Sequence, residues 1–289
     1  MAQTTTTQPA DDPTGFAVRK DLYETIEKER GSKVIHFVTG DRPEMETQIG
    51  PDVIDLFVDH LDELWPIEKL TLILYTPGGN SAAAWRLINL LRTFCEELEI
   101  IVISKAHSAG TLMCLGANRI VMTKQATLGP IDPSLNHPLN PPIPSAPKHR
   151  APVSVEALQG YLDIAQDSLN IKDPASLSHV LTHLASNIHP LVLGQIFRTR
   201  TQIRFLAKKL LSNQDIDDDR KEAIVSFLCS ESGSHDHTIN RRDARELGLV
   251  VENPSQEFYE ILKSLHKSVS DTLKLRTRFS PDTELAGRD

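Results

Sequence analysis

A single serine between small residues interrupts an apolar stretch in the middle of the chain. The stretch KAHSAGTLMCLGANRIVM, residues 105–122, places Ser108 after the β-rich run IIVIS and before the apolar run TLMCLGA. This order indicates strand, turn and helix, and AHSAG approximates the G-x-S-x-G elbow, with Ala106 in place of the first glycine. A serine on such a turn points from the carboxyl edge of a sheet, where the amino end of the helix stabilises negative charge. Ser108 is therefore a candidate nucleophile.

A pair of glycines ends the preceding apolar run. Gly78 and Gly79 follow LTLILYT in the sequence PGGN. Because the carboxyl ends of neighbouring parallel strands lie at one sheet edge, we expect both glycines beside Ser108. Glycines leave backbone N–H groups uncovered, as an oxyanion hole requires. Each motif alone has an ordinary alternative, a helix cap for the serine and a simple turn for the glycines. Their combination at one edge favours a hydrolytic site.

Apolar runs of strand length alternate with helical patterns over the first half of the chain. The run KVIHFVTG is followed by a helical period that starts near Val53. The runs LTLILYT and IIVIS show no alternation, which is typical of strands buried on both faces, and they flank the helix-forming stretch SAAAWRLINLLRTFCEEL. RIVM is again strand-like. Such alternation predicts right-handed crossovers and an α/β fold with a mainly parallel sheet.

The character of the sequence changes at Gly129, where a proline-rich segment begins. We expect this segment, residues 129–152, to be a long extended loop of a kind that is usually functional or mobile. Only helical patterns follow it. The predicted organisation is a disordered tail over residues 1–15, an α/β catalytic core over 16–150, and a helical cap or oligomerisation region over 151–289 that packs on the core.

Composition and charge argue against several classes of partner. The chain carries 39 acidic and 31 basic side chains, a net charge of −8, which repels phosphate backbones, so we expect no nucleic-acid partner. Cys95, Cys114 and Cys229 form no CxxC pair and are typical of reduced thiols in an intracellular protein. No window reaches the roughly 18 apolar residues of a spanning helix. The sequence predicts a cytoplasmic protein without a transmembrane segment, and it leaves open a peripheral membrane contact through the basic, apolar stretch 195–211.

The motifs together resemble the Clp/crotonase superfamily. Within it, the chain is similar to the serine proteases related to signal peptide peptidase A and the Clp proteolytic subunit, and above all to the serine dehydrogenase proteinases. The resemblance covers roughly Lys33–Ser134 and is carried by LILYTPGGN, AWRLINLLR, KAHSAGTLMCLGANRIVM and ATLGPIDPS. HTINRRDARELGLV also resembles the late segment of the family.

The resemblance implies a Clp/crotonase-type spiral of ββα units, followed by a helical C-terminal part. It implies that Ser108 is the nucleophile, that the N–H groups of Gly79 and Ala109 hold the oxyanion, and that Gly78 is a further donor. Peptide-bond hydrolysis through an acyl-enzyme would follow. Relatives form rings that enclose their sites, so the resemblance also implies a homo-oligomer that acts on a peptide or protein substrate.

The general base is less well defined than the nucleophile. In the Clp subunit a histidine follows the serine by about two dozen residues, but here Asp132 stands near that position. Signal peptide peptidases use a lysine, which must be desolvated to be neutral at working pH. Lys148, shortly before the next helix, is the main candidate, with His149 beside it and Asp132 as the alternative. Lys105 lies close to Ser108 in sequence but is expected to point to solvent.

No cofactor follows from the remaining motifs. His235 and His237, with Asp236 between them, could bind a metal, but a polar turn before a helix is the simpler interpretation. The acidic run DIDDDRKE is expected to start a helix, where its carboxylates match the helix dipole, and not to bind calcium. The chain contains no P-loop. We predict neither a metal nor a nucleotide cofactor.

These observations predict a serine peptidase of Ser-Lys or Ser-His type. One alternative is a crotonase-like acyl-CoA enzyme, which would use the same backbone amides on a thioester enolate and would need carboxylates placed for proton transfer. The serine in the elbow favours the peptidase over this alternative. A second alternative, left open by the undefined base, is a catalytically silent scaffold that keeps the fold for assembly.

Overall fold

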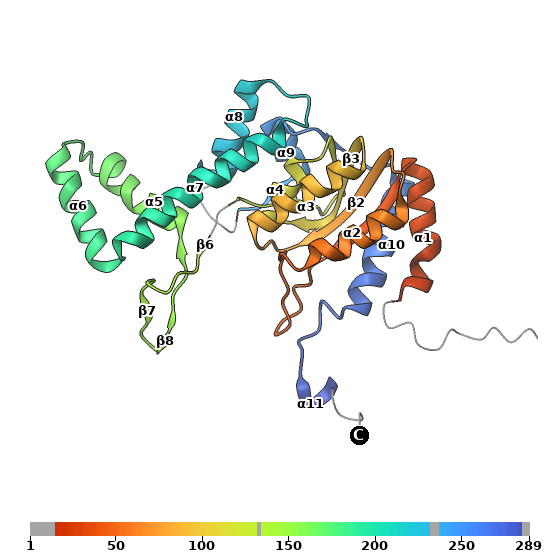
Figure 1. Cartoon of the computed structure of the whole chain (residues 1–289), viewed down its shortest axis with the longest axis horizontal. Helices are drawn as coiled ribbons and strands as arrows, with labels where there is room; N and C mark the ends of the chain where they lie inside the picture. Colours follow the sequence, from red (N-terminus) through yellow and green to blue (C-terminus); the bar gives the residue numbers. More distant parts are fainter. Residues whose placement is uncertain (1–14, 132–133, 232–236, 285–289) are drawn as a thin grey trace, which may run out of the picture.

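The apolar runs of the sequence form a seven-stranded sheet at the centre of the structure (Figure 1). The computed structural model describes residues 15–131, 134–231 and 237–284. The strand order is β1-β2-β3-β4-β11, with β5 beside the end of β3 and β10 beside β5. Each strand pair described in this sheet is parallel except β5 with β10. The structure therefore confirms the predicted α/β fold with a mainly parallel sheet.

The element boundaries follow the predicted runs closely in the first half of the chain. The strands of the central sheet are β1 (Lys33–Val38), β2 (Lys69–Thr76), β3 (Glu97–Ala106), β4 (Arg119–Met122), β5 (Thr127–Leu128), β10 (Ile239–Asn240) and β11 (Val251–Glu252). The helices are α1 (Phe16–Arg30), α2 (Val53–Leu64), α3 (Ser81–Phe94), α4 (Ala109–Leu115), α5 (Val155–Asp163), α6 (Pro174–Asn187), α7 (Pro190–Leu211), α8 (Asp218–Ser226), α9 (Arg241–Leu247), α10 (Gln256–Thr272) and α11 (Pro281–Glu284). Short π-helical segments, Ile164–Ser168 and Phe227–Glu231, continue α5 and α8.

Helices cover both faces of the sheet because successive strand residues point to opposite faces. On one face, Leu72 and Leu74 of β2 belong to the large apolar core shared with α2, α3, α4 and α7. On the other face, Ile73 and Ile101 pack with α1 and α10. All four of these strand side chains are fully buried. The two apolar layers fix the central strands, and with them the strand ends that carry Ser108 and the glycines.

The C-terminal part is mainly helical, as predicted, but it also contributes to the sheet. The expectation that only helices follow the proline-rich segment is wrong, because β11 pairs with β4 and β10 pairs with β5. Helix α10 then covers one face of the sheet through Phe258, Leu262 and Leu265. The chain thus returns to its core after residue 150, the point at which we placed the end of the catalytic core.

The proline-rich segment, which was predicted to be a long extended loop, contributes to two short antiparallel strand pairs. These pairs are formed by β6 (Ser134–Leu135) with β9 (Val153–Ser154), which lies just beyond the segment, and by β7 (Pro142–Ile143) with β8 (Ala146–Arg150). Proline has no N–H to donate, so short two-stranded pairs at the surface suit such a sequence.

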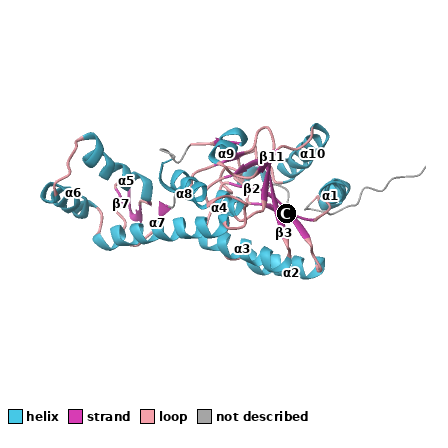
Figure 2. Cartoon of the chain, turned by 90° about the horizontal axis from the view of Figure 1, so that it is seen from above, coloured by secondary structure: helices cyan, strands magenta, loops and turns pink. Residues whose placement is uncertain are grey.

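Helices α5, α6 and α7 form an arm that extends to one side of the sheet, as Figures 1 and 2 show. Helix α7 joins the arm to the core, because Leu210 and Leu211 at its end are buried in the large core while Val192 and Ile196 near its start pack with Val155 of α5. In the part of the chain that the structure describes, no helix combines the length and the apolar character that a membrane span requires.

Candidate active site

Ser108 occupies a strained turn between β3 and α4. Its backbone angles, φ 51° and ψ −114°, lie outside the regions that an L-residue readily adopts. Strain of this kind is typical of functional positions and of the nucleophile elbow in particular. Ser108 stands at the N-cap position of α4, yet its side chain makes no capping hydrogen bond. The hydroxyl is therefore not used as a helix cap, which was the ordinary alternative for this serine.

Backbone hydrogen bonds hold the serine turn against the end of β2. The His107 amide donates to the Thr76 carbonyl at 3.1 Å, and the Gly110 amide donates to the His107 carbonyl at 2.8 Å. Gly110 is required by close packing, because a Cβ at this position would lie 2.4 Å from Cγ2 of Thr76. The turn is thus anchored to the strand that leads into the diglycine.

Gly78 and Gly79 lie beside the serine, as the sequence predicts. Their φ angles, 122° and 146°, favour glycine at both positions. A Cβ on Gly78 would lie 2.9 Å from Cβ and 3.5 Å from Oγ of Ser108, so the bare glycine is what allows this approach. A Cβ on Gly79 would lie 2.4 Å from the backbone nitrogen of Ile49. Both glycines are therefore required by contacts within the site.

The loop between β1 and α2 braces the diglycine. The Ile49 amide donates to the Gly78 carbonyl at 2.9 Å, and the Asn80 amide donates to the Ile49 carbonyl at 2.8 Å. In such a parallel bridge the residue between the two bonded groups directs its own N–H to the opposite side. The Gly79 amide therefore points away from Ile49.

Two backbone amides at this edge are unpaired. No acceptor lies within hydrogen-bonding reach of the Gly79 or Ala109 amide among the residues that the structure describes. The Gly78 amide, in contrast, donates to Oγ1 of Thr76 at 3.0 Å. Ala109 is the first residue of α4, where amides have no partner within the helix. Gly79 and Ala109 thus offer the donors that a carbonyl oxygen would need beside Ser108, and Gly78 serves close packing.

Lys105 is engaged on the other face of the sheet. Its ammonium group forms an ion pair with Asp41, and the Tyr75 hydroxyl donates to the same carboxylate at 2.7 Å. Burial works against the charged carboxylate, but the hydrogen bonds from Lys105 and Tyr75 outweigh it, so the pKa of Asp41 lies below its ordinary value. Burial, followed by the bond to Asp41, raises the pKa of Tyr75. The expectation that Lys105 points to solvent is wrong, because its side chain is only 27% exposed and is paired with Asp41.

Lys148 and His149, the main candidate bases, form no hydrogen bond with Ser108 in the part of the chain that the structure describes. Lys148 and His149 are exposed on β8, in a hairpin that stands apart from the sheet in Figure 1. Asp132 lies outside the described residues. Within the described ranges, no hydrogen bond joins the Ser108 hydroxyl to an ionisable side chain. His107, next to the serine, contacts Oγ1 of Thr127 through Nε2 at 2.9 Å.

The metal site considered as an alternative would consist of His235, Asp236 and His237. Of the residues that could form it, His235 and Asp236 lie outside the described ranges, and His237 is exposed. No group of three or more potential metal ligands occurs within the ranges that are described. His237 instead contacts the ring of Phe227 edge-on, at 6.0 Å between ring centroids.

Sequence reasoning missed the residues that support the site. Thr39, Thr76 and Thr111 are buried hydroxyl side chains that bond the turns of the site. Thr111 contacts the carbonyls of Ala106 and Gly129, each at 2.8 Å. The available signal was a threonine at or next to either end of an apolar run, where a buried hydroxyl must find a partner.

Two curated relatives share part of the sequence. The uncharacterised protein MJ0137 of Methanocaldococcus jannaschii is 28% identical over 197 residues, which are 68% of this chain and 58% of that protein. The chain thus spans less than two thirds of this relative. A second uncharacterised protein of the same organism, MJ1495, is 25% identical over 248 residues, 82% of this chain and 73% of its own.

Two solved structures of one protease align with the chain. A mutant of the 1510-N membrane-bound stomatin-specific protease in complex with a substrate peptide aligns with 80% of this chain and 78% of its own, at 17% identity and a TM-score of 0.46. A second mutant of the same protease aligns with 80% and 82%, at 16% identity and a TM-score of 0.47. The family model of the ClpP-like SDH-type serine proteinases matches residues 14–173, more than half of the chain. By this match, the chain belongs to the family of ClpP-like SDH-type serine proteinases.

Proposed function

We propose that the chain hydrolyses peptide bonds with Ser108 as nucleophile and the amides of Gly79 and Ala109 as oxyanion hole. The observation that carries this proposal is the hydrogen bonding of the Ser108 hydroxyl and of the Gly79 and Ala109 amides. The serine hydroxyl makes no capping bond, and neither amide at the same sheet edge has an acceptor among the residues described by the structure. Buried polar groups are normally satisfied, so donors kept free beside a strained serine suit a transition state that supplies the missing acceptor.

The reaction follows from these positions. Oγ of Ser108 attacks the carbonyl carbon of the scissile peptide bond as a general base removes its proton. The oxygen of that carbonyl gains negative charge, which the two amides stabilise. The base then returns the proton to the leaving amine, and the remaining acyl group stays on Oγ until water, activated in the same way, releases it.

We assign the role of base to Lys148, with Asp132 as the alternative. A lysine acts as a base only when its proton is lost, which requires desolvation because its ordinary pKa is near 10.4. Lys148 is exposed on its hairpin in the single chain. The hairpin must therefore approach Ser108 when substrate binds or when another copy of the chain packs against it. Exposed apolar side chains on the arm, among them Leu181, Leu191 and Phe197, support such a homo-oligomer.

Peptidase assays on four variants test this assignment. Ser108→Ala should abolish cleavage of a peptide library or unfolded protein, and Lys148→Ala should reduce kcat by 10²-fold or more, in line with the loss of a general base. Lys148→Arg should be equally inactive because an arginine keeps its proton. Lys172→Ala, which removes an exposed lysine on the arm, is the matched control and should retain full activity.

Three results would overturn parts of this proposal, and a fourth, recovery on mixing two variants, would refine it. Unchanged activity of Lys148→Ala would reject Lys148 as the base. Recovery of activity when Ser108→Ala and Lys148→Ala chains are mixed would instead show that one copy supplies its lysine to the serine of another. A folded wild-type chain that cleaves no peptide would contradict the peptidase and favour the silent scaffold. Turnover of an acyl-CoA thioester without peptide cleavage would favour the crotonase-like alternative.

A further inference from the structure

A pair of buried hydroxyl groups lies directly behind the diglycine. Thr39 follows β1 and Thr76 ends β2, and their side chains are 4% and 0% exposed. The two Oγ1 atoms are 2.6 Å apart. Oγ1 of Thr76 also accepts the Gly78 amide at 3.0 Å and lies 3.3 Å from the Gly78 carbonyl oxygen. One threonine hydroxyl thus contacts both polar backbone groups of Gly78.

The direction of the protons follows from the number of donors. A hydroxyl donates one hydrogen and accepts two. Oγ1 of Thr76 accepts the Gly78 N–H, and its own hydrogen is needed for the contact with the Gly78 carbonyl. With the hydrogen of Thr76 directed to the Gly78 carbonyl, Thr39 is the donor in the 2.6 Å contact between the two hydroxyl groups. In this arrangement each of the three contacts has one donor and one acceptor.

These bonds fix the plane of the Gly78–Gly79 peptide. The Gly78 carbonyl accepts from the Ile49 amide at 2.9 Å and from the Thr76 hydroxyl at 3.3 Å. A trans peptide is planar, so its N–H points opposite to its carbonyl. Holding the carbonyl of Gly78 toward Ile49 and Thr76 therefore holds the N–H of Gly79 toward the opposite side. Glycine pairs otherwise rotate freely, so the plane needs such an anchor.

We infer that Thr76 is the positioning residue that aims the Gly79 amide at the developing oxyanion, an inference that rests on the proposed function. The same side chain also reaches the serine turn. The methyl group of Thr76 packs against Gly110, where an added Cβ would lie only 2.4 Å from it. The backbone carbonyl of Thr76 accepts the His107 amide at 3.1 Å. Thr76 thus links the diglycine to the serine elbow and sets the distance between the oxyanion donors and Oγ of Ser108.

The two functions of Thr76 can be separated by substitution. Thr76→Val keeps the shape and the methyl contact but removes the hydroxyl. Thr76→Ser keeps the hydroxyl but removes the methyl group. Thr39→Val leaves the hydroxyl of Thr76 in place but removes its outer donor. If the hydroxyl aims the amide, Thr76→Val should be far more damaging to catalysis than Thr76→Ser.

The test is steady-state kinetics on a cleavable peptide, combined with binding of a peptide boronate and of an uncleavable peptide of the same sequence. Loss of one oxyanion donor lowers kcat by about 10²- to 10³-fold. For Thr76→Val we expect a decrease of about 10²-fold in kcat and in boronate affinity, with KM and uncleavable-peptide affinity within threefold of wild type. Thr76→Ser should stay within about threefold of wild type on each measure, because the hydroxyl that aims the amide is retained.

Folding of each variant is checked by its melting temperature. A folded Thr76→Val with wild-type kcat and boronate affinity would overturn the inference. Equal decreases of kcat in Thr76→Val and Thr76→Ser would also overturn it. Should Thr76→Val not fold, Thr39→Val decides: we expect a severalfold lower kcat at unchanged KM, and an unchanged kcat contradicts the inference. A wild-type chain that neither cleaves peptides nor binds the boronate contradicts the proposed function itself. An active wild type whose kcat and boronate affinity are unchanged in Thr76→Val contradicts only this inference.

Discussion

At the scale of single residues, the site depends on positions where a side chain is absent. Gly78 and Gly79 have positive φ angles and approach Ser108 and Ile49 more closely than any Cβ would permit. Ser108 itself carries backbone strain that the neighbouring turns must hold. The geometry of the site is thus set by backbone contacts that one methyl group would disrupt.

Substitution of Gly79 by alanine tests this dependence. The new Cβ would lie 2.4 and 2.5 Å from the backbone nitrogen and oxygen of Ile49, and φ of 146° is unfavourable for alanine. We expect Gly79→Ala to lower the free energy of unfolding by about 1–3 kcal/mol and kcat by 10²-fold or more. Gly160→Ala is the control, because its Cβ would meet nothing within 4 Å. Urea unfolding measures the free energy of unfolding, and peptidase assays measure kcat. Equal values of both quantities in Gly79→Ala and Gly160→Ala would contradict the dependence on Gly79.

The positions of Ser108 and the glycines could be predicted because each is a local signal. Ser108 and the diglycine follow apolar runs directly, and parallel topology brings strand ends together. Thr39 and Ile49 could not be predicted as parts of the site. They come from the loop after β1, whose sequence has no periodicity and whose path is set by contacts with distant segments.

At the scale of elements, the C-terminal strap, residues 274–280, packs on the loop between β1 and α2. Nε of Arg42 donates to the Thr277 carbonyl at 2.9 Å, and the Phe279 amide donates to the Pro43 carbonyl at 3.0 Å. The Arg42 guanidinium also lies 5.3 Å from the centre of the Phe279 ring. The same loop continues to Ile49, which braces the diglycine. The strap therefore supports the active edge from the far end of the chain.

Removal of the strap should loosen the diglycine. We expect deletion of residues 274–289 to increase hydrogen exchange at the amides of Ile49 and Asn80 and to lower kcat more than it raises KM. Arg278→Ala is the control, because its ion pair with Glu44 is exposed on both sides and such pairs contribute at most about 1 kcal/mol. Hydrogen exchange is measured by mass spectrometry. Unchanged exchange at the Ile49 and Asn80 amides in the deletion variant would show that the strap does not support the diglycine.

The start of β3 shows where element prediction fails. The stretch SAAAWRLINLLRTFCEEL predicts a helix as far as Leu98, but Glu97 and Leu98 form the first residues of β3. Arg30 and Arg119 pair with the carboxylates of Glu99 and Glu97, respectively, from α1 and β4. These partners make a buried strand position acceptable for glutamate, and they cannot be read from local sequence.

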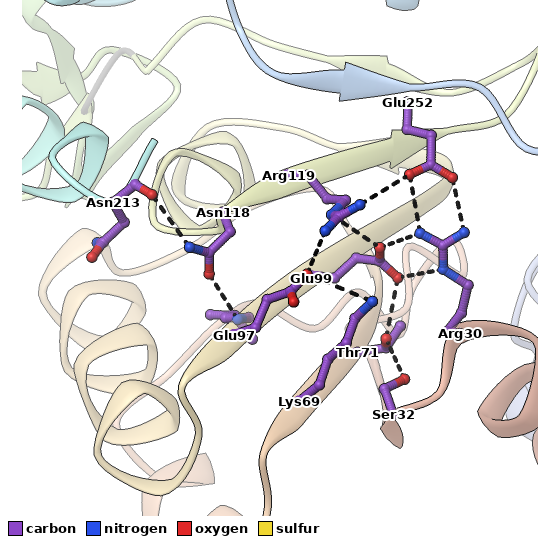
Figure 3. Close-up of polar contacts among 11 residues, drawn as sticks. Arg30, Ser32, Lys69, Thr71, Glu97, Glu99, Asn118, Arg119, Asn213 and Glu252 are labelled. Atoms are coloured by element: carbon purple, nitrogen blue, oxygen red, sulfur yellow. Dashed lines mark hydrogen bonds and ion pairs between the residues drawn. The ribbon is translucent and has the colours of Figure 1, made fainter. Parts of the chain in front are cut away.

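At the scale of the whole molecule, an ion-pair network closes the amino edge of the sheet (Figure 3). Arg30 of α1 pairs with the fully buried Glu99 and, at 2.8 Å, with Glu252 of β11. Arg119 pairs with Glu97 at 2.6 Å. The network thus joins the first helix of the described chain to its last strand. It lies at the sheet edge opposite Ser108, so it contributes to stability and not to the site.

Stability should therefore fall in acid. The hydrogen bond from Arg30, against opposing burial, holds the pKa of Glu252 below its ordinary value of 4.5. Burial raises the pKa of Glu97, but Arg119 and Lys69 lower it by more, so this pKa is also depressed. A carboxylate with a depressed pKa stabilises the fold above its ordinary pKa, and this contribution is lost as the pH falls through the folded-state value.

Urea unfolding at a series of pH values measures this effect. We expect the free energy of unfolding of the wild type to fall as the pH decreases from about 5 to 3. Glu252→Gln should be less stable at pH 7 and should show a flatter dependence over that range. Glu246→Gln, which breaks an exposed pair with Arg242, is the control and should keep the wild-type slope. A wild-type slope for Glu252→Gln would contradict the assigned role of the network.

The general base is the part of the molecule that sequence could least predict. Its identity depends on where a proline-rich hairpin lies relative to Ser108, and neither periodicity nor turn chemistry specifies that distance. The position of Ser108 has no such dependence, because strand, turn and helix fix it within one short segment. The central claim therefore concerns Ser108 and can be tested without knowledge of the base.

Covalent labelling by a fluorophosphonate tests that claim most directly. The reagent reacts with a serine whose hydroxyl is activated beside an oxyanion hole, and peptide mapping by mass spectrometry identifies the labelled residue. The account predicts one adduct, on Ser108, that is absent from Ser108→Ala and from the wild-type chain unfolded in urea. Labelling at another serine, or no labelling of the folded wild-type chain, would contradict it.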